Sequence, residues 1–172
     1  AAPAKGQADW TMMVYAVGQS GLGLPDRDYY FNDDERSKKI RDEYVAHLTK
    51  MFGLLGDDAA TSAANAKTVM EFETRLAGGS LKNTELRDPA ASYHMMTLAE
   101  RKALTPTFSW ERYESAIGLQ GGATINVAHP KFIQEVDAMM KSVPLDAWKT
   151  YLRWMVVNSF ADTLSTPFVD QN

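Results

Sequence analysis

Apolar residues recur at three- and four-residue spacing over two neighbouring stretches in the first half of the chain, and this pattern predicts two amphipathic helices. The first is expected to begin near Glu35 and to end before Gly56. The second is expected to begin at Asp57 or Asp58 and to run to about Ala77. Because the connection is short, the helices are predicted to form an antiparallel pair. The positions expected to face the core are Ile40, Tyr44, Leu48, Met51, Phe52 and Leu55 in the first helix and Val69, Met70, Phe72 and Leu76 in the second.

Four further helices are predicted in the second half of the chain. Thr97–Glu100 has the spacing of a capping box, and the helix that it begins is interrupted at Thr105–Pro106. Ser109 is expected to cap the next, short helix. Pro130 and Pro144 suit the first turns of two longer helices, the second of which is expected to be the last. Their predicted buried positions are Phe132, Ile133, Val136 and Met140, and then Trp148, Tyr151, Leu152, Met155, Val156 and Phe160.

Two short apolar stretches, Thr11–Val17 and Thr124–Val127, are typical of strands and are expected to pair as a small β-ribbon. The predicted fold class is therefore mainly α, a multi-helix domain that can include this ribbon. Residues 1–172 are expected to form a single domain, with an extended segment at 1–17, a loop at 18–31 and a helical bundle at 32–172. No closing element is expected after Thr166, which predicts that the domain is truncated inside a longer chain.

Composition narrows the class of protein only slightly. A chain of 172 residues with 45% hydrophobic and 23% charged residues is long enough for a globular domain with a substantial core. Its net charge of −4 and the lack of a basic stripe argue against a nucleic-acid partner. No apolar run is long enough to span a bilayer, and residues 1–8 lack the apolar core of a signal peptide. The chain has no cysteine, so the composition leaves the compartment undetermined.

The histidines do not predict a metal site. His47, His94 and His129 are far apart in the sequence, and none belongs to an H-E-x-x-H pair, the spacing that places two zinc ligands on one helix face. His47 lies on a predicted helix and is expected to be a surface or boundary residue, and His94 is expected to be partly buried beside two methionines. His129 precedes a proline and is interpreted as a helix cap.

Other patterns of catalytic and binding residues are also missing. There is no G-x-S-x-G elbow, no P-loop lysine and no third glycine of a dinucleotide fingerprint. The acidic runs Asp33–Glu35 and Asp57–Asp58 lie at predicted helix starts, where carboxylates are expected as caps. The methionines Met51, Met70, Met139, Met140 and Met155 are expected to fill the core. The sequence therefore predicts no catalytic, cofactor-binding or metal-binding residue within this chain.

The loop at residues 18–31 is the most distinctive part of the sequence. Gly21 and Gly23 can adopt backbone conformations closed to other residues, which permits a sharp turn between two leucines. Pro25 suits the first position of a short helical turn, and Arg27 is placed to pair with a carboxylate such as that of Asp28. Two interpretations remain open: a packed loop that fixes one element against another, or a loop that contacts a peptide substrate. The candidate residues are Gly21, Leu22, Gly23, Leu24, Pro25, Arg27, Asp28, Tyr29 and Tyr30.

This run, Gly-Leu-Gly-Leu-Pro-Asp-Arg-Asp-Tyr-Tyr from Gly21 to Tyr30, resembles a signature of the neprilysin and endothelin-converting-enzyme family of zinc metalloendopeptidases. We therefore call residues 18–31 the signature loop. Further stretches are similar to features of that family in the same order, and the similarity extends from Gly18 over nearly the whole chain. These stretches are Arg87-Asp88-Pro89, Tyr93 with Met96–Glu100, Phe108-Ser109-Trp110 and the late helix around Trp148–Leu164.

The resemblance implies that this chain is part of the N-terminal helical lobe of such an enzyme, which helps to enclose a peptide-binding chamber. It places the zinc ligands and the catalytic glutamate C-terminal to Asn172, so zinc is expected as a cofactor of the parent enzyme only. The implied partners are the catalytic lobe of the same polypeptide and peptide substrates. The lack of cysteine departs from the disulfide-rich animal members and fits a bacterial protein that is periplasmic or secreted. The alternative is a free-standing helical module that binds peptides or a partner protein without hydrolysis.

Overall fold

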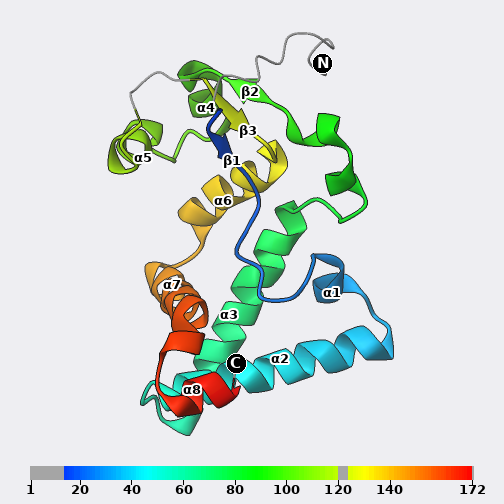
Figure 1. Ribbon diagram of the computed structural model, residues 1–172, viewed down its shortest axis with the longest axis vertical. Coiled ribbons are helices and arrows are strands. Elements are labelled where there is room, and N and C mark those ends of the chain that lie inside the picture. Colours follow the sequence, from blue (N-terminus) through cyan, green and yellow to red (C-terminus); the bar gives the residue numbers. More distant parts are fainter. Residues whose placement is uncertain (1–13, 120–123, 172) are drawn as a thin grey trace. The chain divides into compact units, whose positions relative to one another are not determined.

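The computed structural model describes residues 14–119 and 124–171, and they form a mainly helical structure with a small sheet (Figure 1). Compact packing divides these residues into two units. Of the described residues, unit 1 comprises 14–20, 78–119 and 124–142, and unit 2 comprises 21–77 and 143–171. The fold class expected from the sequence is confirmed. The single domain over residues 1–172 stays a prediction.

The elements follow one another in the order β1, α1, α2, α3, β2, α4, α5, β3, α6, α7 and α8, with short 3-10 turns at Glu85–Arg87, Pro89–Ser92 and Ala161–Thr163. The helices are α1 (Asp28–Phe31), α2 (Glu35–Leu54), α3 (Ala59–Gly79), α4 (Leu98–Leu104), α5 (Trp110–Ala116), α6 (Pro130–Ser142), α7 (Leu145–Phe160) and α8 (Thr166–Gln171). The strands are β1 (Ala16–Val17), β2 (Met95–Met96) and β3 (Ile125–Val127).

Helices α2 and α3 of unit 2 begin where the acidic residues predict. Asp34 caps α2, because its carboxylate accepts hydrogen bonds from Ser37 N–H at 2.9 Å and from Ser37 Oγ at 2.7 Å. Asp58 does the same at the start of α3, where it accepts from Thr61 N–H at 2.8 Å. Their expected core positions are confirmed: Leu48, Met51, Phe52, Val69, Phe72 and Leu76 are buried, and Ile40, Tyr44, Leu55 and Met70 are half-buried.

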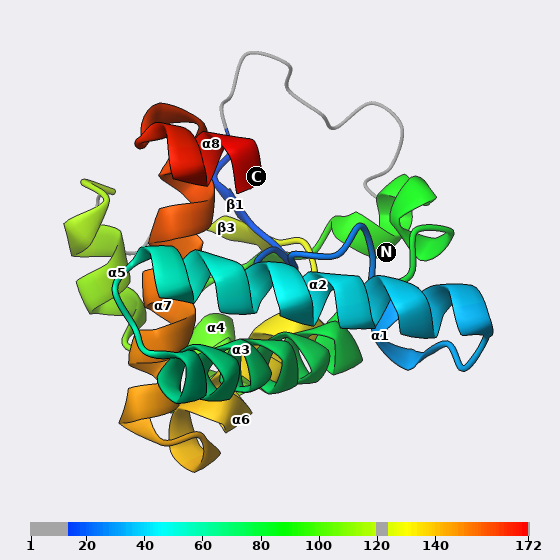
Figure 2. The ribbon, with the colours of Figure 1, turned by 90° about the horizontal axis from the view of Figure 1, so that it is seen from below.

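Helices α2 and α3 run in opposite directions, as predicted (Figure 2), but they do not pack closely along their length. The two helices diverge from their short connection as a V (Figure 1). The cause is the segment that precedes α2, since Leu24 and Tyr30 pack with Ala77 in a buried cluster against residues of both helices. The opening of the V is therefore filled by the signature loop, which a helix-by-helix analysis of the sequence could not place there.

Helix α7 presents a different face to the core of unit 2 from the one expected. Tyr151, Trp154 and Val157 are buried, and Ala161, just after the helix, continues the same stripe. The predicted burial of Leu152, Val156 and Phe160 is wrong, because these side chains are 54%, 60% and 57% exposed. Together with Leu145 they form an exposed apolar ridge, which we call the α7 ridge.

A further helix follows α7, so the prediction that no element closes the chain after Thr166 is also wrong. Helix α8 turns away from the end of α7 (Figure 2) and packs against α2. Gln171 of α8 lies 3.2 Å from the ring of His47, measured from its Nε2 to Nδ1. The short length of α8 and its single Pro-Phe-Val apolar run explain why helical periodicity did not reveal it.

The sheet of unit 1 has the strand order β1-β3-β2. Strand β1 runs parallel to β3, with Ala16 opposite Asn126, which confirms the pairing expected between these two stretches. Residues 11–13 of the longer predicted strand lie outside the described residues. Strand β2 pairs antiparallel to the other side of β3 and was not predicted, because two residues are too short to show alternation.

Helix α4 is attached to the sheet and to α5 by one buried arginine. The capping box is confirmed, with Thr97 N–H donating to Glu100 at 2.7 Å and Glu100 N–H donating to Thr97 Oγ1 at 3.4 Å. Arg101 is fully buried, donates to the carbonyl of Met96 at 2.7 Å and forms an ion pair with the buried Glu114 of α5. A single guanidinium therefore holds the end of β2, α4 and α5 together.

Two details of the predicted short elements in unit 1 are wrong. Ser109 occupies the N-cap position of α5 but makes no side-chain cap bond. Instead, Asp137 of α6 accepts hydrogen bonds from Thr107 N–H at 2.8 Å and Phe108 N–H at 3.0 Å. Met140 of α6 is 41% exposed rather than buried, because Met139 takes the core position beside it.

Candidate functional site

Residues 21–31 of the signature loop belong to unit 2, and this part of the loop is anchored at both ends by hydrogen bonds. Gly21 has a φ of 87°, in the left-handed region, and its carbonyl accepts from Tyr151 Oη at 2.8 Å. At the other end, Arg27 Nε donates to the carbonyl of Ala77 at 3.1 Å, and Arg27 pairs with Asp28 at 3.3 Å as expected. The loop thus binds α7 at one point and α3 at the other.

The glycine at position 21 is predicted to be required for this conformation. Gly21→Ala is expected to lower the free energy of unfolding by about 1–3 kcal/mol, because a β-carbon at positive φ is strained and would also overlap the Tyr151 hydroxyl. Denaturant titration of the variant measures the effect. Gly53→Ala in α2 is the matched control, since its β-carbon would meet only Ser62 Oγ, at 3.8 Å, and a helical alanine is expected to be stabilising. Equal effects of the two substitutions would contradict the prediction.

Gly23 is explained by a close approach rather than by backbone freedom, which corrects the expectation for this residue. Among the described glycines, positive φ occurs at positions 21, 56 and 118 and not at 23. A β-carbon on Gly23 would instead overlap the hydroxyl of Tyr44. Pro25 also differs from its expected role, because α1 begins three residues later, at Asp28, with Arg27 at the N-cap.

A buried carboxylate, Glu73 of α3, organises the loop. It accepts hydrogen bonds from Tyr30 Oη at 2.7 Å, from Tyr44 Oη at 2.9 Å and from Gly23 N–H at 3.2 Å. Tyr30 Oη also accepts from Leu24 N–H at 3.0 Å, so the network continues into the loop backbone. One side chain of α3 therefore fixes the loop and α2 together.

The electrostatics of this cluster suit structure more than acid–base chemistry. Burial raises the pKa of Glu73, while the tyrosine hydroxyls and Gly23 N–H oppose that rise by donating to the carboxylate. Burial and the nearby Glu73 charge raise the pKa of both Tyr30 and Tyr44 far above the ordinary value, so both phenols stay protonated as donors. The hydrogen-bonding groups of Glu73, Tyr30 and Tyr44 are thus paired with one another inside the core.

Glu73 was missed at the level of sequence, although a signal was present. It lies four residues after Val69 and three before Leu76, within the apolar face of α3. A charged residue at a position that periodicity assigns to the core needs buried partners. The partners themselves come from residues 29 and 43 positions away along the chain, so they could not be identified from spacing.

The histidines occupy unrelated environments, and the described residues contain no cluster of three potential ligands that could hold a metal ion. His47 of unit 2 is half-buried against Tyr44 and Trp154, and burial lowers its pKa. His94 and His129 belong to unit 1, where Nδ1 of His94 is buried without a hydrogen-bond partner. The donor set described here does not fit the zinc site that the family resemblance implies for the parent enzyme.

The ring of His129 is committed to structural bonds. Its Nδ1 accepts from Gln19 N–H at 2.8 Å, so the proton of the neutral ring resides on Nε2, which faces Ser92 Oγ at 3.3 Å. With Nε2 as the donor, His129 cannot act as the general base for Ser92 in this tautomer. Burial lowers the pKa of His129, which favours the neutral form that the Gln19 bond requires. His129 directly precedes α6, as expected of a cap, and its carbonyl accepts from Ile133 N–H at 3.2 Å, while its ring links α6 to Gln19, two residues after β1.

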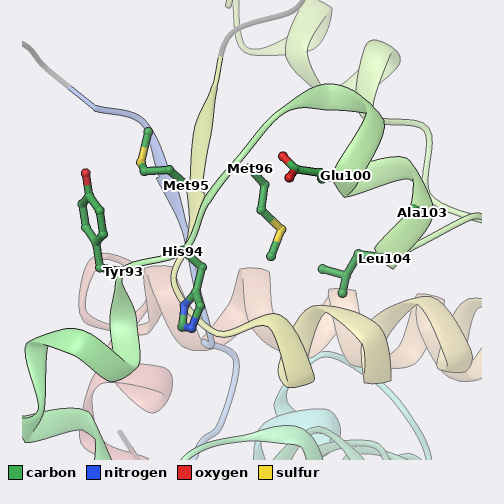
Figure 3. A pocket seen from close by; sticks show the side chains of 7 residues that line it. All are labelled: Tyr93, His94, Met95, Met96, Glu100, Ala103 and Leu104. Atoms are coloured by element: carbon green, nitrogen blue, oxygen red, sulfur yellow. The ribbon is translucent and has the colours of Figure 1, made fainter. Parts of the chain in front are cut away.

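A depression in unit 1 lies beside the edge strand β2 and has a volume of about 610 Å³. Its walls come from β2, the residues just before it, and α4 (Figure 3). Glu100 reaches toward the strand from the first turn of α4, while Met96 and Leu104 provide apolar surface (Figure 3). We call this depression the β2 pocket, lined by Tyr93, His94, Met95, Met96, Glu100, Ala103 and Leu104.

Comparisons with known proteins agree with this architecture. A family model described as Peptidase family M13 matches residues 4–172. The chain is 30% identical to neprilysin-3 of Drosophila melanogaster over 168 residues and 30% identical to endothelin-converting enzyme 1 of Rattus norvegicus over 163 residues. Each match covers 91% of this chain but 21% of the relative, so the chain spans about a fifth of the length of these proteins.

Solved structures give the same result. The zinc metalloprotease Zmp1 of Mycobacterium tuberculosis, in complex with an inhibitor, matches with a TM-score of 0.83 and 28% identity over 91% of this chain and 24% of Zmp1. Its open state matches equally well. The fold and the signature loop thus define a helical N-terminal lobe of the kind found in neprilysin-like peptidases. The chain belongs to peptidase family M13.

Proposed function

We propose that this chain is the non-catalytic helical wall of a bacterial zinc metalloendopeptidase, in which it helps to enclose a chamber that admits peptides. The observation that carries the proposal is the match of a helical lobe at a TM-score of 0.83 to about a quarter of a zinc metalloprotease. Zinc, its ligands and the catalytic glutamate belong to the part of the parent polypeptide outside residues 1–172. The catalytic lobe and peptide substrates are then its partners.

The signature loop has a structural role in this proposal. Its supporting observations are the buried bonds of Tyr30 and Gly23 to Glu73 and the anchoring of Gly21 and Arg27. A loop held at four points keeps α2, α3 and α7 in a fixed arrangement within unit 2. The chamber wall is then rigid where these helices meet. These bonds account for Gly21, Gly23, Arg27 and Tyr30 without direct contact with substrate.

The α7 ridge supports the proposal that a larger body surrounds this chain. A helix that is apolar around most of its circumference is typical of the interior of a larger protein. The ridge side chains Leu145, Leu152, Val156 and Phe160 are 54–68% exposed, and they lie on the face opposite the buried Tyr151 and Trp154. Since the relatives are about five times as long as this chain, further polypeptide is available to cover the ridge.

We place the parent protein outside the cytoplasm, in the periplasm or the surrounding medium of a bacterium. The lack of cysteine in residues 1–172 differs from the disulfide-rich animal members, and the matching Zmp1 is a bacterial protein. Among the described helices, none has both the length and the apolar character needed to cross a membrane.

The proposal predicts that residues 1–172 alone hydrolyse no peptide, with or without added zinc, because the described residues hold no metal-binding group. The full-length parent is expected to cleave peptides and to lose this activity when zinc is chelated. Incubation of both proteins with a quenched fluorescent peptide library measures the difference. Chelator-sensitive turnover by the segment itself would overturn the assignment of a non-catalytic lobe.

A second measurement separates the parent enzyme from a free-standing module. The coding sequence beyond Asn172 is expected to contain H-E-x-x-H, whose two histidines bind zinc, followed by a helix that bears the third protein ligand, a glutamate. If these motifs are missing and a purified natural protein of this length binds peptides without cleaving them, the enzyme proposal fails and the binding module replaces it.

A further inference from the structure

The backbone of Met95 faces the outer edge of the sheet, where no strand of the described residues pairs with β2. Val127 N–H donates to the carbonyl of His94 at 2.9 Å, and Met95 is registered opposite Asn126. This pattern places Met95 at a non-hydrogen-bonded position of the antiparallel ladder, where the N–H and C=O of a residue point away from the partner strand. Asn126 confirms the geometry, because its own N–H points the other way and donates to Tyr15 of the β1 side at 2.9 Å.

The β2 pocket adjoins this edge and offers surface for side chains on both sides of the strand. Tyr93 and Met95 line one part of the pocket, and Met96 and Leu104 line another (Figure 3). Methionine side chains are flexible and polarisable, so they adapt to apolar groups of different shape. An extended peptide beside β2 would therefore find a backbone partner at Met95 and tolerant apolar contacts for alternate side chains.

The charge of the pocket is one-sided. Glu100 carries the only carboxylate among the lining residues, and no lysine or arginine lines the pocket. One of its oxygens, Oε2, accepts from Thr97 N–H and Thr97 Oγ1, both at 2.7 Å, and these bonds lower its pKa. Among residues 14–119 and 124–171 no donor is bonded to the other oxygen, Oε1, so it can accept from a ligand. The capping box thus holds an ionised carboxylate in a fixed position beside the open strand edge.

We infer that the β2 edge binds an extended segment of a peptide substrate, with one peptide residue paired to Met95 and a lysine or arginine side chain of the peptide at Glu100. The inference rests on the proposed function for its choice of ligand class. It assigns the lobe a subsite that selects cationic peptides, separate from any residue of the signature loop. The negative charge of Glu100 favours a peptide that carries a lysine or arginine over an uncharged strand of the same polypeptide.

The charge preference is tested with Glu100→Gln in the full-length polypeptide that contains this chain. Glutamine preserves the capping box but removes the charge. A set of fluorescein-labelled nonapeptides carries one lysine at a different position of an otherwise neutral sequence. Their binding is measured by fluorescence anisotropy at 4 °C, and chromatography checks that the peptides stay intact. At one position, lysine is expected to bind about 2–5-fold more tightly than norleucine, as for an exposed ion pair, and Glu100→Gln is expected to abolish that difference. Glu111→Gln, at an exposed carboxylate paired with Lys102, is expected to leave it unchanged.

The backbone contact is tested with Met95→Pro, which removes only the outward N–H and spares the bonds to β3. It is expected to weaken binding of all the peptides about 2–10-fold, whereas Met95→Leu, which keeps the N–H, stays within about twofold of the parent. If Met95→Pro does not fold, N-methylation of each peptide residue in turn supplies the same test on the ligand, with one position expected to lose affinity. Unchanged lysine preference in Glu100→Gln, or equal binding of all N-methylated peptides, would overturn the inference.

These readouts are independent of hydrolysis. A parent protein that cleaves no peptide but shows the lysine preference would refute the proposed enzyme and retain the binding site. A zinc-dependent peptidase whose variants bind every peptide like the parent would retain the enzyme and refute the site. If Met95→Pro lowers the melting temperature but leaves peptide binding unchanged, a strand of the same polypeptide covers the edge. That result would also refute the peptide-binding site.

Discussion

Replacing Arg101 by methionine is expected to lower the free energy of unfolding by about 3–5 kcal/mol. The substitution leaves Glu114, which is 1% exposed, as a buried carboxylate without its cationic partner. It also removes the donor to the Met96 carbonyl and the guanidinium that lies 5.2 Å from the ring centroid of Trp110. Equilibrium denaturation followed by tryptophan fluorescence measures the loss.

The pair of substitutions Arg101→Met and Glu114→Leu provides the decisive comparison. Because a buried ion pair costs much desolvation energy, replacing both partners by apolar residues is expected to recover most of the stability that the single variant loses. Lys102→Met is the control, since this neighbouring cation pairs with Glu111 at the surface and is expected to change stability by less than about 1 kcal/mol. A double variant as unstable as Arg101→Met would show that the loss comes from packing.

Replacing Glu73 by alanine is expected to cost about 3 kcal/mol, because Tyr30, Tyr44 and Gly23 would each lose a buried acceptor. Glu73→Gln keeps an acceptor of the same shape and is expected to cost less. Glu71→Ala is the matched control on α3, since Glu71 is exposed and pairs with Lys67 across one helical turn. Denaturant titration compares the three variants, and a similar loss for Glu71→Ala would refute the role given to Glu73.

The same carboxylate gives a signed pH dependence. Burial raises the pKa of Glu73 in the folded state above its ordinary value, so its stabilising contribution is complete below the unfolded pKa and is lost as pH rises through the folded pKa. We compare the free energy of unfolding of the unsubstituted chain with that of Glu73→Gln. The difference is expected to fall as pH rises from about 4.5, the ordinary pKa of glutamate, toward neutrality. A difference that stays constant with pH would show that the group titrates alike in both states.

Much of the fold could be predicted because its signals are local. The helical periods of α2 and α3, the aspartate caps at their starts and the Thr97–Glu100 capping box are each set within one or two turns of the chain. The resemblance of the signature loop also identified the family that the later comparison confirmed. Each of these predictions needed no knowledge of which distant residues come into contact.

The predictions that failed depend on distant partners. The ridge residues Leu152, Val156 and Phe160 were expected in the core because they are apolar, yet only Tyr151, Trp154 and Val157 of α7 face unit 2. When a helix is apolar on two faces, its sequence does not reveal which face packs against the core of its own unit. Strand β2 was missed for a similar reason, since its existence depends on β3, about 30 residues further along the chain.

The sequence by itself thus determined the helical class, the starts of α2, α3 and α4, and the family. Only the tertiary structure decided that Glu73 collects Tyr30, Tyr44 and Gly23, that Arg101 is buried against Glu114, and that the backbone of Met95 faces an open edge. Helix periods and caps arise from neighbours along the chain. Buried polar partners and free strand edges arise from residues that only folding brings together, so no local pattern encodes them.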